Sequence, residues 1–277
     1  MGLRWGSLAA ALLAAASAAS AAQAAPWPTP ARPGVQVFRY EGQEAAPGSI
    51  KGYRTDFRLR TDHAGGVTAA IISSQTFDGR AWTPVTADPA CLAAMGARPG
   101  ELATVRLYPM SPEAAKLGDA FLAPCAPAGV FFPLTDILNV TLILASDTFG
   151  VRKLAAPGEK ASFAGFSTTL DRLGIQMAEA SAGGEVTLVS VGKDQATLDW
   201  KPAPSKITLV EQAGGSAVHL SGTETFAFRL VVDRRTGVLV RADSLYDDLD
   251  LAIAAPGLPV DKPPRMAVKR TVSISPR

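Results

Sequence analysis

A succession of short alternating segments, separated by glycine-containing turns, most limits what this chain can fold into. Residues 53–61 alternate polar and apolar side chains, a His-Ala-Gly-Gly turn follows at 63–66, and residues 67–76 alternate again. Alternation on both sides of a glycine turn is typical of a β-hairpin. Residues 35–40 are expected to form a strand ahead of it.

The same pattern returns after Pro157-Gly158 and continues almost to the end of the chain. Glycine pairs and the run Gly192-Lys193-Asp194 punctuate it as turns. Short strands at regular spacing predict a meandering antiparallel sheet. The expected strands are 160–169, 173–180, 185–191, 195–200, 206–212, 218–222, 225–233, 238–245 and 266–275.

Two segments are candidate helices within this β pattern. Residues 112–123 could form a short helix, and Leu134–Ser146 is the stronger candidate because Thr135 or Asp136 stands near its start. Its β-branched residues suit a buried strand equally well, so both conformations stay open. The predicted fold class is therefore mainly β: a curved antiparallel meander, as a half-barrel or a sandwich, with one or two short helices.

Two hairpins carry the same residues at the same spacing. Shared turn chemistry explains such a repeat of residues, because glycine supplies the positive φ that turns need. The alternative is a duplicated β unit, which would divide the β domain (35–277) into halves at 35–150 and 151–277. The matching residues are Phe57-Arg58-Leu59, Asp62, Gly66 and Val67 in one hairpin, and Phe228-Arg229-Leu230, Asp233, Gly237 and Val238 in the other.

Residues 1–24 have the three-part pattern of a secretory signal peptide. Arg4 is followed by an uncharged run of Ala, Leu and Ser that closes on Ala22-Gln23-Ala24. A retained membrane anchor is the alternative, since about 20 apolar residues can span a bilayer. The run is only weakly apolar, however, and no basic cluster follows it. We expect cleavage, a Pro-rich lead-in at 25–34, and a periplasmic or secreted mature protein.

The rest of the chain gives little reason to expect membrane or nucleic-acid partners. The longest later apolar stretch, Val130–Ala145, is interrupted by Pro133, Asp136 and Asn139, so no later window is expected to span a membrane. Basic and acidic residues are nearly balanced, 27 against 25, and dispersed. This argues against nucleic acid as a partner.

Cys91 and Cys125 are the two cysteines of the chain. In an oxidising compartment an even pair is most simply a disulfide. In the chain-entropy model such a bridge stabilises by about 3–4 kcal/mol. A redox-active or nucleophilic thiol is the alternative, but active dithiols usually sit much closer together, as Cys-x-x-Cys.

No catalytic, metal or cofactor site is predicted. His63 and His219 stand far apart, and no Gly-x-Ser-x-Gly elbow, zinc-binding histidine pair or nucleotide-binding glycine motif occurs. Carboxylates gather at Asp243, Asp247, Asp248 and Asp250 and could bind calcium, but the EF-hand spacing is absent. We favour the alternative that Asp248 and Asp250 face solvent while Leu249 and Leu251 face inward.

One long motif in the C-terminal half resembles a known group of proteins. The motif is Gly222-Thr-Glu-Thr-Phe226-Ala-Phe228-Arg-Leu-Val-Val-Asp233-Arg-Arg-Thr-Gly237-Val-Leu-Val-Arg241-Ala, followed by a last strand through Val268, Thr271, Val272 and Ile274. It resembles secreted bacterial incomplete-β-barrel proteins, such as the lipoprotein-localisation factors and related families of unknown function. The resemblance covers about the last 120 residues and, more faintly, residues 35–76. It implies a curved sheet around an apolar hollow, with helices or loops as a lid.

The role expected from these observations is non-enzymatic binding of an apolar small molecule or lipid, or of an envelope protein. A structural or assembly protein of the cell envelope is the alternative. A hydrolase is the least supported class, because the sequence supplies no nucleophile–base pair. Residues that could form a lid or plug over the hollow, or plain core instead, are Val130, Phe131, Phe132, Leu134, Ile137 and Leu138.

Overall fold

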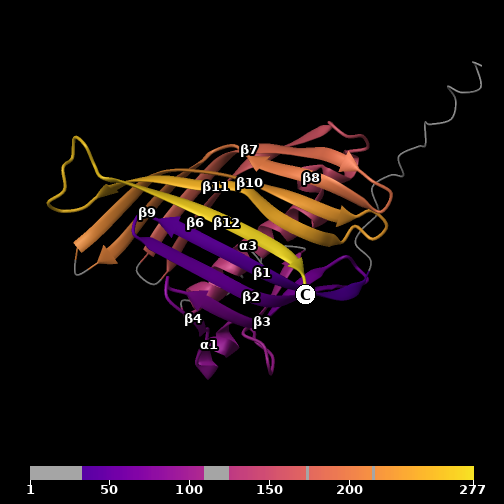
Figure 1. Ribbon diagram of the computed structural model, residues 1–277, viewed down its shortest axis with the longest axis horizontal. Helices are drawn as coiled ribbons and strands as arrows, with labels where there is room; N and C mark the ends of the chain where they lie inside the picture. Colours follow the sequence, from indigo (N-terminus) through magenta and orange to yellow (C-terminus); the bar gives the residue numbers. More distant parts are fainter. Residues whose placement is uncertain (1–32, 109–124, 173–174, 214–215) are drawn as a thin grey trace, which may run out of the picture.

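The computed structural model describes residues 33–108, 125–172, 175–213 and 216–277. These residues form one antiparallel sheet of 12 strands, accompanied by helices (Figure 1). The predicted fold class is confirmed. The predicted signal peptide, nearly all of the Pro-rich lead-in and the candidate helix at 112–123 lie outside the described residues.

The N-terminal part of the chain builds one flank of the sheet. β1 (Gly34–Ala46) pairs with β2 (Ser49–Thr61), and β2 pairs with β3 (Val67–Phe77). Both β4 (Trp82–Pro84) and β5 (Ala103–Tyr108) then pair with β3. The predicted hairpin at 53–76 is thereby confirmed, whereas β5 was not predicted.

The C-terminal part builds the other flank and returns to the first strand. The sheet order is β4-β3-β2-β1-β12-β11-β10-β8-β7-β6, so the last strand pairs with β1. Both β8 and β9 pair with β7 and with β10, and together they act as one interrupted strand. The strands are β6 (Lys160–Arg172), β7 (Ile175–Val191), β8 (Gln195–Pro202), β9 (Ser205–Ala213), β10 (Ser216–Asp233), β11 (Leu239–Ala254) and β12 (Arg265–Pro276).

Two of the predicted strand breaks are wrong. β7 continues through Gly183-Gly184, and β10 continues through Gly222. Gly183 has φ 114°, and a Cβ on Gly222 would overlap the Asp250 carbonyl oxygen. A glycine inside a strand permits a bend or a close approach of backbones without ending the strand. The sequence pattern alone does not separate these two uses of glycine.

The two hairpins with matching residues use the same type of aspartate-capped turn, but the turns differ in length. Asp62 Oδ1 accepts hydrogen bonds from the amides of Ala64 and Gly66, and Asp233 Oδ1 accepts them from Arg235 and Thr236. The first turn closes between the Gly65 amide and the Asp62 carbonyl, whereas the second closes one residue later, at Gly237. Both turns therefore use the same turn chemistry, and duplication of a β unit stays an untested alternative.

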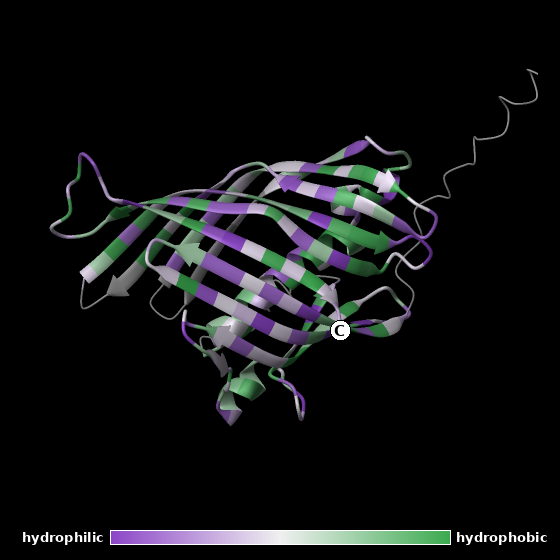
Figure 2. Ribbon diagram, viewed as in Figure 1, coloured by the Kyte–Doolittle hydropathy of each residue, from purple (hydrophilic) through white to green (hydrophobic). Residues whose placement is uncertain are grey.

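Helix α3 (Ala128–Ala145) lies against β2, β3 and β5, and runs behind β1 and β2 in Figure 1. The predicted helix at Leu134–Ser146 is confirmed and is longer than expected. Side chains on α3 join the same core as inward side chains from both flanks of the sheet. Figure 2 shows the alternation of hydrophilic and hydrophobic residues along the strands that produces this inner face.

The length and composition of α3 correct one prediction. This helix of 18 residues has a mean hydropathy of 1.7, enough by these measures to cross a membrane. The expectation that no later segment is long enough was wrong, because Pro133, Asp136 and Asn139 do not interrupt the helix. Half of the helix is buried inside the protein, against the sheet.

A second helix, which contains Cys91, lies below the sheet in Figure 1. Helix α1 (Pro89–Ala94) begins after Asp88, whose carboxylate accepts a hydrogen bond from the Cys91 amide. Cys91 and Cys125 lie at disulfide distance, with Cα atoms 5.7 Å apart, as predicted. The bridge ties α1 to the residues that lead into α3.

Pro133 in the interior of α3 explains a buried polar contact with the sheet. Proline has no amide hydrogen, so the carbonyl four residues earlier, on Gly129, loses its helical donor. Hydroxyls from two strands replace it: Ser74 Oγ donates at 2.6 Å and Thr55 Oγ1 at 3.3 Å. Gly129 permits this approach, because a Cβ there would lie 2.7 Å from Val85.

This arrangement predicts a specific coupling between Ser74 and Pro133. Ser74→Ala leaves the Gly129 carbonyl short of its closest donor and should lower the free energy of unfolding by about 1–3 kcal/mol. Pro133→Ala restores the helical donor, so the same Ser74 substitution should cost clearly less in that background. Urea unfolding of the two single variants and the double variant measures the difference. Equal costs in both backgrounds would contradict the account.

Candidate functional site

A buried cluster of charged side chains lies where α3 meets β1, β10, β11 and β12. Arg270 stands at its centre: its Nη2 is 2.9 Å from Asp136 Oδ2, and its Nη1 is 3.0 Å from Asp247 Oδ2. Glu44 and Glu224 approach the same guanidinium at 3.7 and 3.9 Å. We call these five side chains the Arg270 cluster.

Strand register places the cluster on the inner face of the sheet. Glu44 lies directly opposite Arg270 on the neighbouring strand. Simple alternation would put Asp247 on the outer face with Asp243, but a β-bulge intervenes: Ala227 pairs with Tyr246 whereas Phe228 pairs with Ser244. The extra residue reverses the facing of β11 beyond this point. Asp247 therefore points inward, where its side chain is only 1% exposed.

Tyr40 extends the cluster toward the core. Its hydroxyl donates a hydrogen bond of 2.8 Å to Asp136 Oδ2, and its ring is buried. The ring lies over Gly42, where a Cβ would stand 2.5 Å from the Tyr40 hydroxyl oxygen. A side chain at position 42 would thus push the phenol away from α3. Burial, reinforced by the Asp136 charge, raises the pKa of Tyr40, which keeps it a neutral donor.

The cluster holds more negative groups than positive ones. Four carboxylates face one guanidinium, which leaves three negative charges unmatched if all of them ionise. Burial, together with the charges of Asp247 and Glu179, raises the pKa of Glu224 to about 8. Burial also raises the pKa of Asp247. At neutral pH this pair therefore retains a proton, as neighbouring carboxyls do when both cannot ionise.

The raised pKa of Glu224 predicts a pH-dependent stability. Because this pKa lies above the ordinary 4.5, the stabilising contribution is complete below pH 4.5 and is lost as pH rises through about 8. Glu224→Gln removes the titration, so its free energy of unfolding relative to the native chain should rise by about 1–3 kcal/mol between about pH 5 and pH 9. Denaturant unfolding at both pH values measures this. Parallel pH curves would contradict the assignment.

Arg270 predicts a large difference between two arginines of the same strand. Arg270→Met leaves buried carboxylates without their counter-charge and should destabilise by about 3–5 kcal/mol. Arg265 also pairs with an aspartate, Asp250, but both side chains are 57% exposed. Arg265→Met is therefore the matched control, with an expected loss of at most about 1 kcal/mol. Similar losses in thermal or urea unfolding would show that the Arg270 cluster is not a buried network.

Beyond the cluster, the inner face of the sheet becomes apolar. Met177, Leu209, Leu220 and Ile253 lie opposite one another in register, on the successive strands β7, β9, β10 and β11. Leu249 and Val268 form a neighbouring pair across β11 and β12. All six side chains are half-buried, and we call them the apolar strand ends. Figure 1 shows β9, β10 and β11 running past the end of α3.

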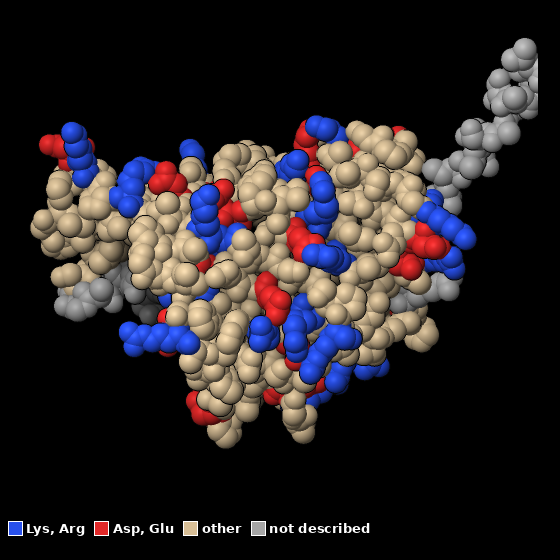
Figure 3. Space-filling view, in the orientation of Figure 1, with Lys and Arg blue, Asp and Glu red and all other residues tan. Residues whose placement is uncertain are grey.

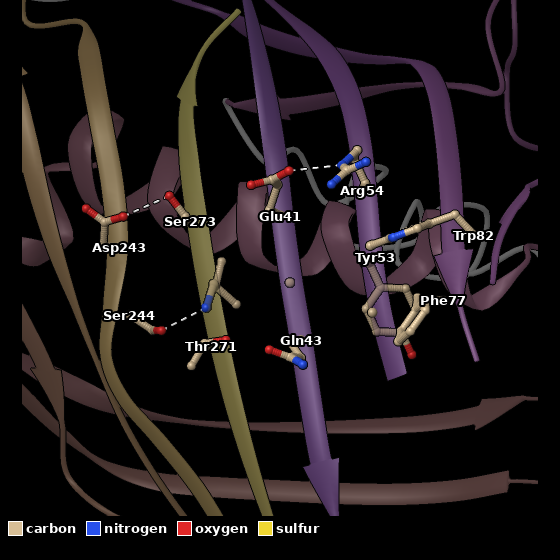
Figure 4. Close-up of a pocket in the computed structure, with 13 residues that line it drawn as sticks. Glu41, Gln43, Tyr53, Arg54, Phe77, Trp82, Asp243, Ser244, Thr271 and Ser273 are labelled. Carbon is tan, nitrogen blue, oxygen red and sulfur yellow. Dashed lines mark hydrogen bonds and ion pairs between the residues drawn. The ribbon is translucent and has the colours of Figure 1, made fainter. Parts of the chain in front are cut away.

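A separate cavity of about 460 Å³ lies on the outer face, over β1, β2, β11 and β12 (Figure 4). Four of its polar side chains form two pairs: Arg54 with Glu41, and Ser273 with Asp243. Arg54 also lies over the Trp82 ring, 4.5 Å from its centroid. Figure 3 shows basic and acidic side chains interspersed on the face drawn there.

The predicted lid or plug residues all lie on α3, inside the curved sheet. Leu134 and Ile137 are buried in the common core. Phe131, Phe132 and Leu138 are half-buried, and the Phe132 ring stands 5.4 Å from the Tyr53 ring. The helix thus occupies space that the resemblance describes as a hollow. The structure brings these residues together but places them apart from the apolar strand ends.

Asp248, Asp250, His63 and His219, the other candidates from the sequence, lie outside the Arg270 cluster. Asp248 and Asp250 pair with Lys269 and Arg265 and remain about half exposed, while Leu251 is buried. His63 lies in the β2–β3 turn and His219 is exposed on β10. Within the described ranges, no group of His, Cys, Asp or Glu is suited to hold a metal ion.

Sequence reasoning missed the Arg270 cluster, although one signal for it existed. Glu224 stands between Gly222 and Phe226, at an inward position of an alternating strand. A charged residue in such a position is rarely buried without a partner. The partner residues come from β1, α3, β11 and β12, and only the folded sheet brings them together.

Comparison with known proteins adds no family assignment. No family model matches the chain, and no curated protein matches it. Among solved structures, a mutant of the Rh. blastica porin aligns over 88% of this chain and 99% of its own, at 6% identity and a TM-score of 0.16. A score this low carries no argument about fold or function.

Proposed function

We propose that this protein binds a ligand with an apolar chain at the apolar strand ends, without catalysing a reaction. The observation that supports this most directly is the row of half-buried side chains from Met177 through Leu209 and Leu220 to Ile253. Contiguous apolar surface left partly open to water is typical of a binding surface.

The position of α3 defines where such a ligand would lie. Its side chains already fill the hollow next to β2, β3 and β5, so that part of the inner face has no free apolar surface to offer. The strand ends continue past the helix (Figure 1). The Arg270 cluster stands between the two regions, because Glu224 lies on the same face of β10 as Leu220. A ligand would therefore lie along the strand ends and reach the cluster at one end.

The proposed compartment is the periplasm or the exterior of the cell. The signal-peptide pattern of residues 1–24 supports it, and so does the pairing of Cys91 with Cys125. Disulfides persist in oxidising compartments and are rare in the cytosol. A ligand with an apolar chain would be a lipid or a similar envelope component.

Uptake of a neutral apolar dye tests the proposal. Mature protein should bind N-phenyl-1-naphthylamine, and Leu220→Glu should weaken binding by about tenfold or more, because it places a charge in the apolar row. Ser221→Glu is the matched control: the neighbouring residue faces outward and is exposed, so dye affinity should be unchanged. Fluorescence titration gives the affinities, and circular dichroism verifies that both variants are folded.

Two results would overturn the proposal. One is the absence of dye uptake by the native chain. The other is an equal effect of the Leu220 and Ser221 substitutions, which would place the dye elsewhere. Either result would favour the alternative role of a structural or assembly protein of the envelope, to be pursued by cross-linking to partner proteins.

A further inference from the structure

We propose that the ligand carries a positively charged headgroup, such as a primary ammonium, which binds at Glu224 and Asp247 while its apolar chain lies along the apolar strand ends. This inference rests on the proposed function and names the class of ligand for the same site. The ligand would be a cationic amphiphile.

The first argument is the charge of the site. Glu44, Asp136, Glu224 and Asp247 surround the single guanidinium of Arg270. Glu179 adds a further carboxylate whose charge acts on Glu224. The other titratable groups facing the cluster, Tyr40 and Tyr53, are neutral donors to carboxylates. Even with Arg270 counted, a cation is attracted here and an anion is repelled.

The second argument is a pair of buried polar atoms whose only neighbours for hydrogen bonding, among the described residues, are other acidic groups of the site. Asp247 Oδ1 and Ser205 Oγ are buried and make no hydrogen bond of ordinary geometry. Asp247 interacts instead with the carboxyl group of Glu224, and Ser205 with that of Glu179. Ser205 lies directly opposite Glu224 on the neighbouring strand, and its exposure is 0%. Buried polar atoms are normally paired, and an exception often indicates an absent ligand, ion or water. An ammonium group offers three donors to such acceptors.

The third argument is access. Asp247 is buried, but three other side chains of the cluster are partly exposed to solvent. The exposed fractions are 13% for Glu224, 17% for Arg270 and 18% for Glu44. These three side chains form the open side of the cluster, and Glu224 is the carboxylate among them that lies on the same strand as Leu220. Glu224 lies opposite Leu249, four pairs along the ladder from the pair formed by Leu220 and Ile253 and on the same face of the sheet. A headgroup at Glu224 thus leaves an attached apolar chain in register with the apolar strand ends.

The fourth argument is that a bound ammonium would replace the proton held by the carboxyl pair. With an empty site, the carboxyl pair retains a proton, because burial and neighbouring negative charge oppose ionisation of Glu224. A bound ammonium supplies the missing positive charge, and that proton is released to solvent. A neutral headgroup would leave the proton in place and gain less, and a carboxylate headgroup would add a further negative charge.

Three amphiphiles with the same dodecyl chain test the inference. Dodecylamine, dodecanol and dodecanoate differ only in headgroup, and at pH 7 the amine is cationic while the acid is anionic. Each is titrated below its aggregation concentration against N-phenyl-1-naphthylamine bound to mature protein. Dodecylamine should displace the dye at a concentration about tenfold lower than dodecanol, which corresponds to about 1.4 kcal/mol, and dodecanoate should be the weakest competitor.

A variant pair assigns the effect to Glu224. Glu224→Gln should remove most of the preference for the amine over the alcohol, measured as the ratio of the two concentrations that displace the dye from the same variant. Glu185→Gln is the matched control, since this carboxylate is exposed on β7 and pairs with Lys160. It should keep the native preference.

The outcomes separate this inference from the proposed function. If the native chain binds neither the dye nor any amphiphile, the proposed function itself fails. If the dye binds but the three amphiphiles compete equally, or dodecanoate competes best, only the cationic headgroup is refuted. An unchanged amine preference in Glu224→Gln would also refute the assignment, because the cation would then bind elsewhere.

Discussion

The Arg270 guanidinium joins parts of the chain that lie far apart in sequence. Through Glu44 and Asp136 it connects the first strand and the central helix to the last strand, and through Asp247 it reaches β11. A buried guanidinium is tolerated only while its counter-charges stay in place. Three features therefore depend on one another. They are the pairing of β12 with β1, the inward facing of Asp247 beyond the β11 bulge, and the position of α3. Moving any one of them would leave a charge unpaired in the interior.

Two sets of polar contacts fix the position of α3 along the sheet. Apolar contacts are not directional, and an almost wholly apolar helix could shift along a curved apolar face at little cost. The Gly129 carbonyl, held by Ser74 and Thr55, and the Asp136 carboxylate, held by Arg270 and Tyr40, each accept hydrogen bonds at one position only. The helix is consequently fixed beside β2 and β3. The apolar strand ends remain uncovered by it for the same reason.

The parts of the fold that local sequence controls could be predicted, and the parts that depend on register could not. Alternation and turn residues locate most strands, and Cys91 and Cys125 indicate their own pairing. The expected inward facing of Leu249 and Leu251 implies that Asp247 also faces inward, but its place beside Arg270 could not be predicted, because it depends on strand pairing and on a bulge within the pairing of β11 with β10. The start of α3 was missed because Pro133 is tolerated only when Ser74, more than fifty residues earlier, replaces the lost donor. The charged cluster was missed for the same physical reason, since its members come from five elements.

An excess of buried negative charge lowers stability, and a protein has no structural reason to retain it. The single carboxylate of Asp136 would suffice to balance Arg270 and to fix α3, yet four carboxylates surround Arg270, and the two on β10 and β11 hold a proton at neutral pH. Local departures of this kind, where one rule of stable folding is broken amid otherwise consistent packing, are expected at functional sites. The surplus lies at the border of an exposed apolar surface. A purely apolar ligand would leave that surplus unused, whereas a cationic amphiphile would match both the surface and the charge.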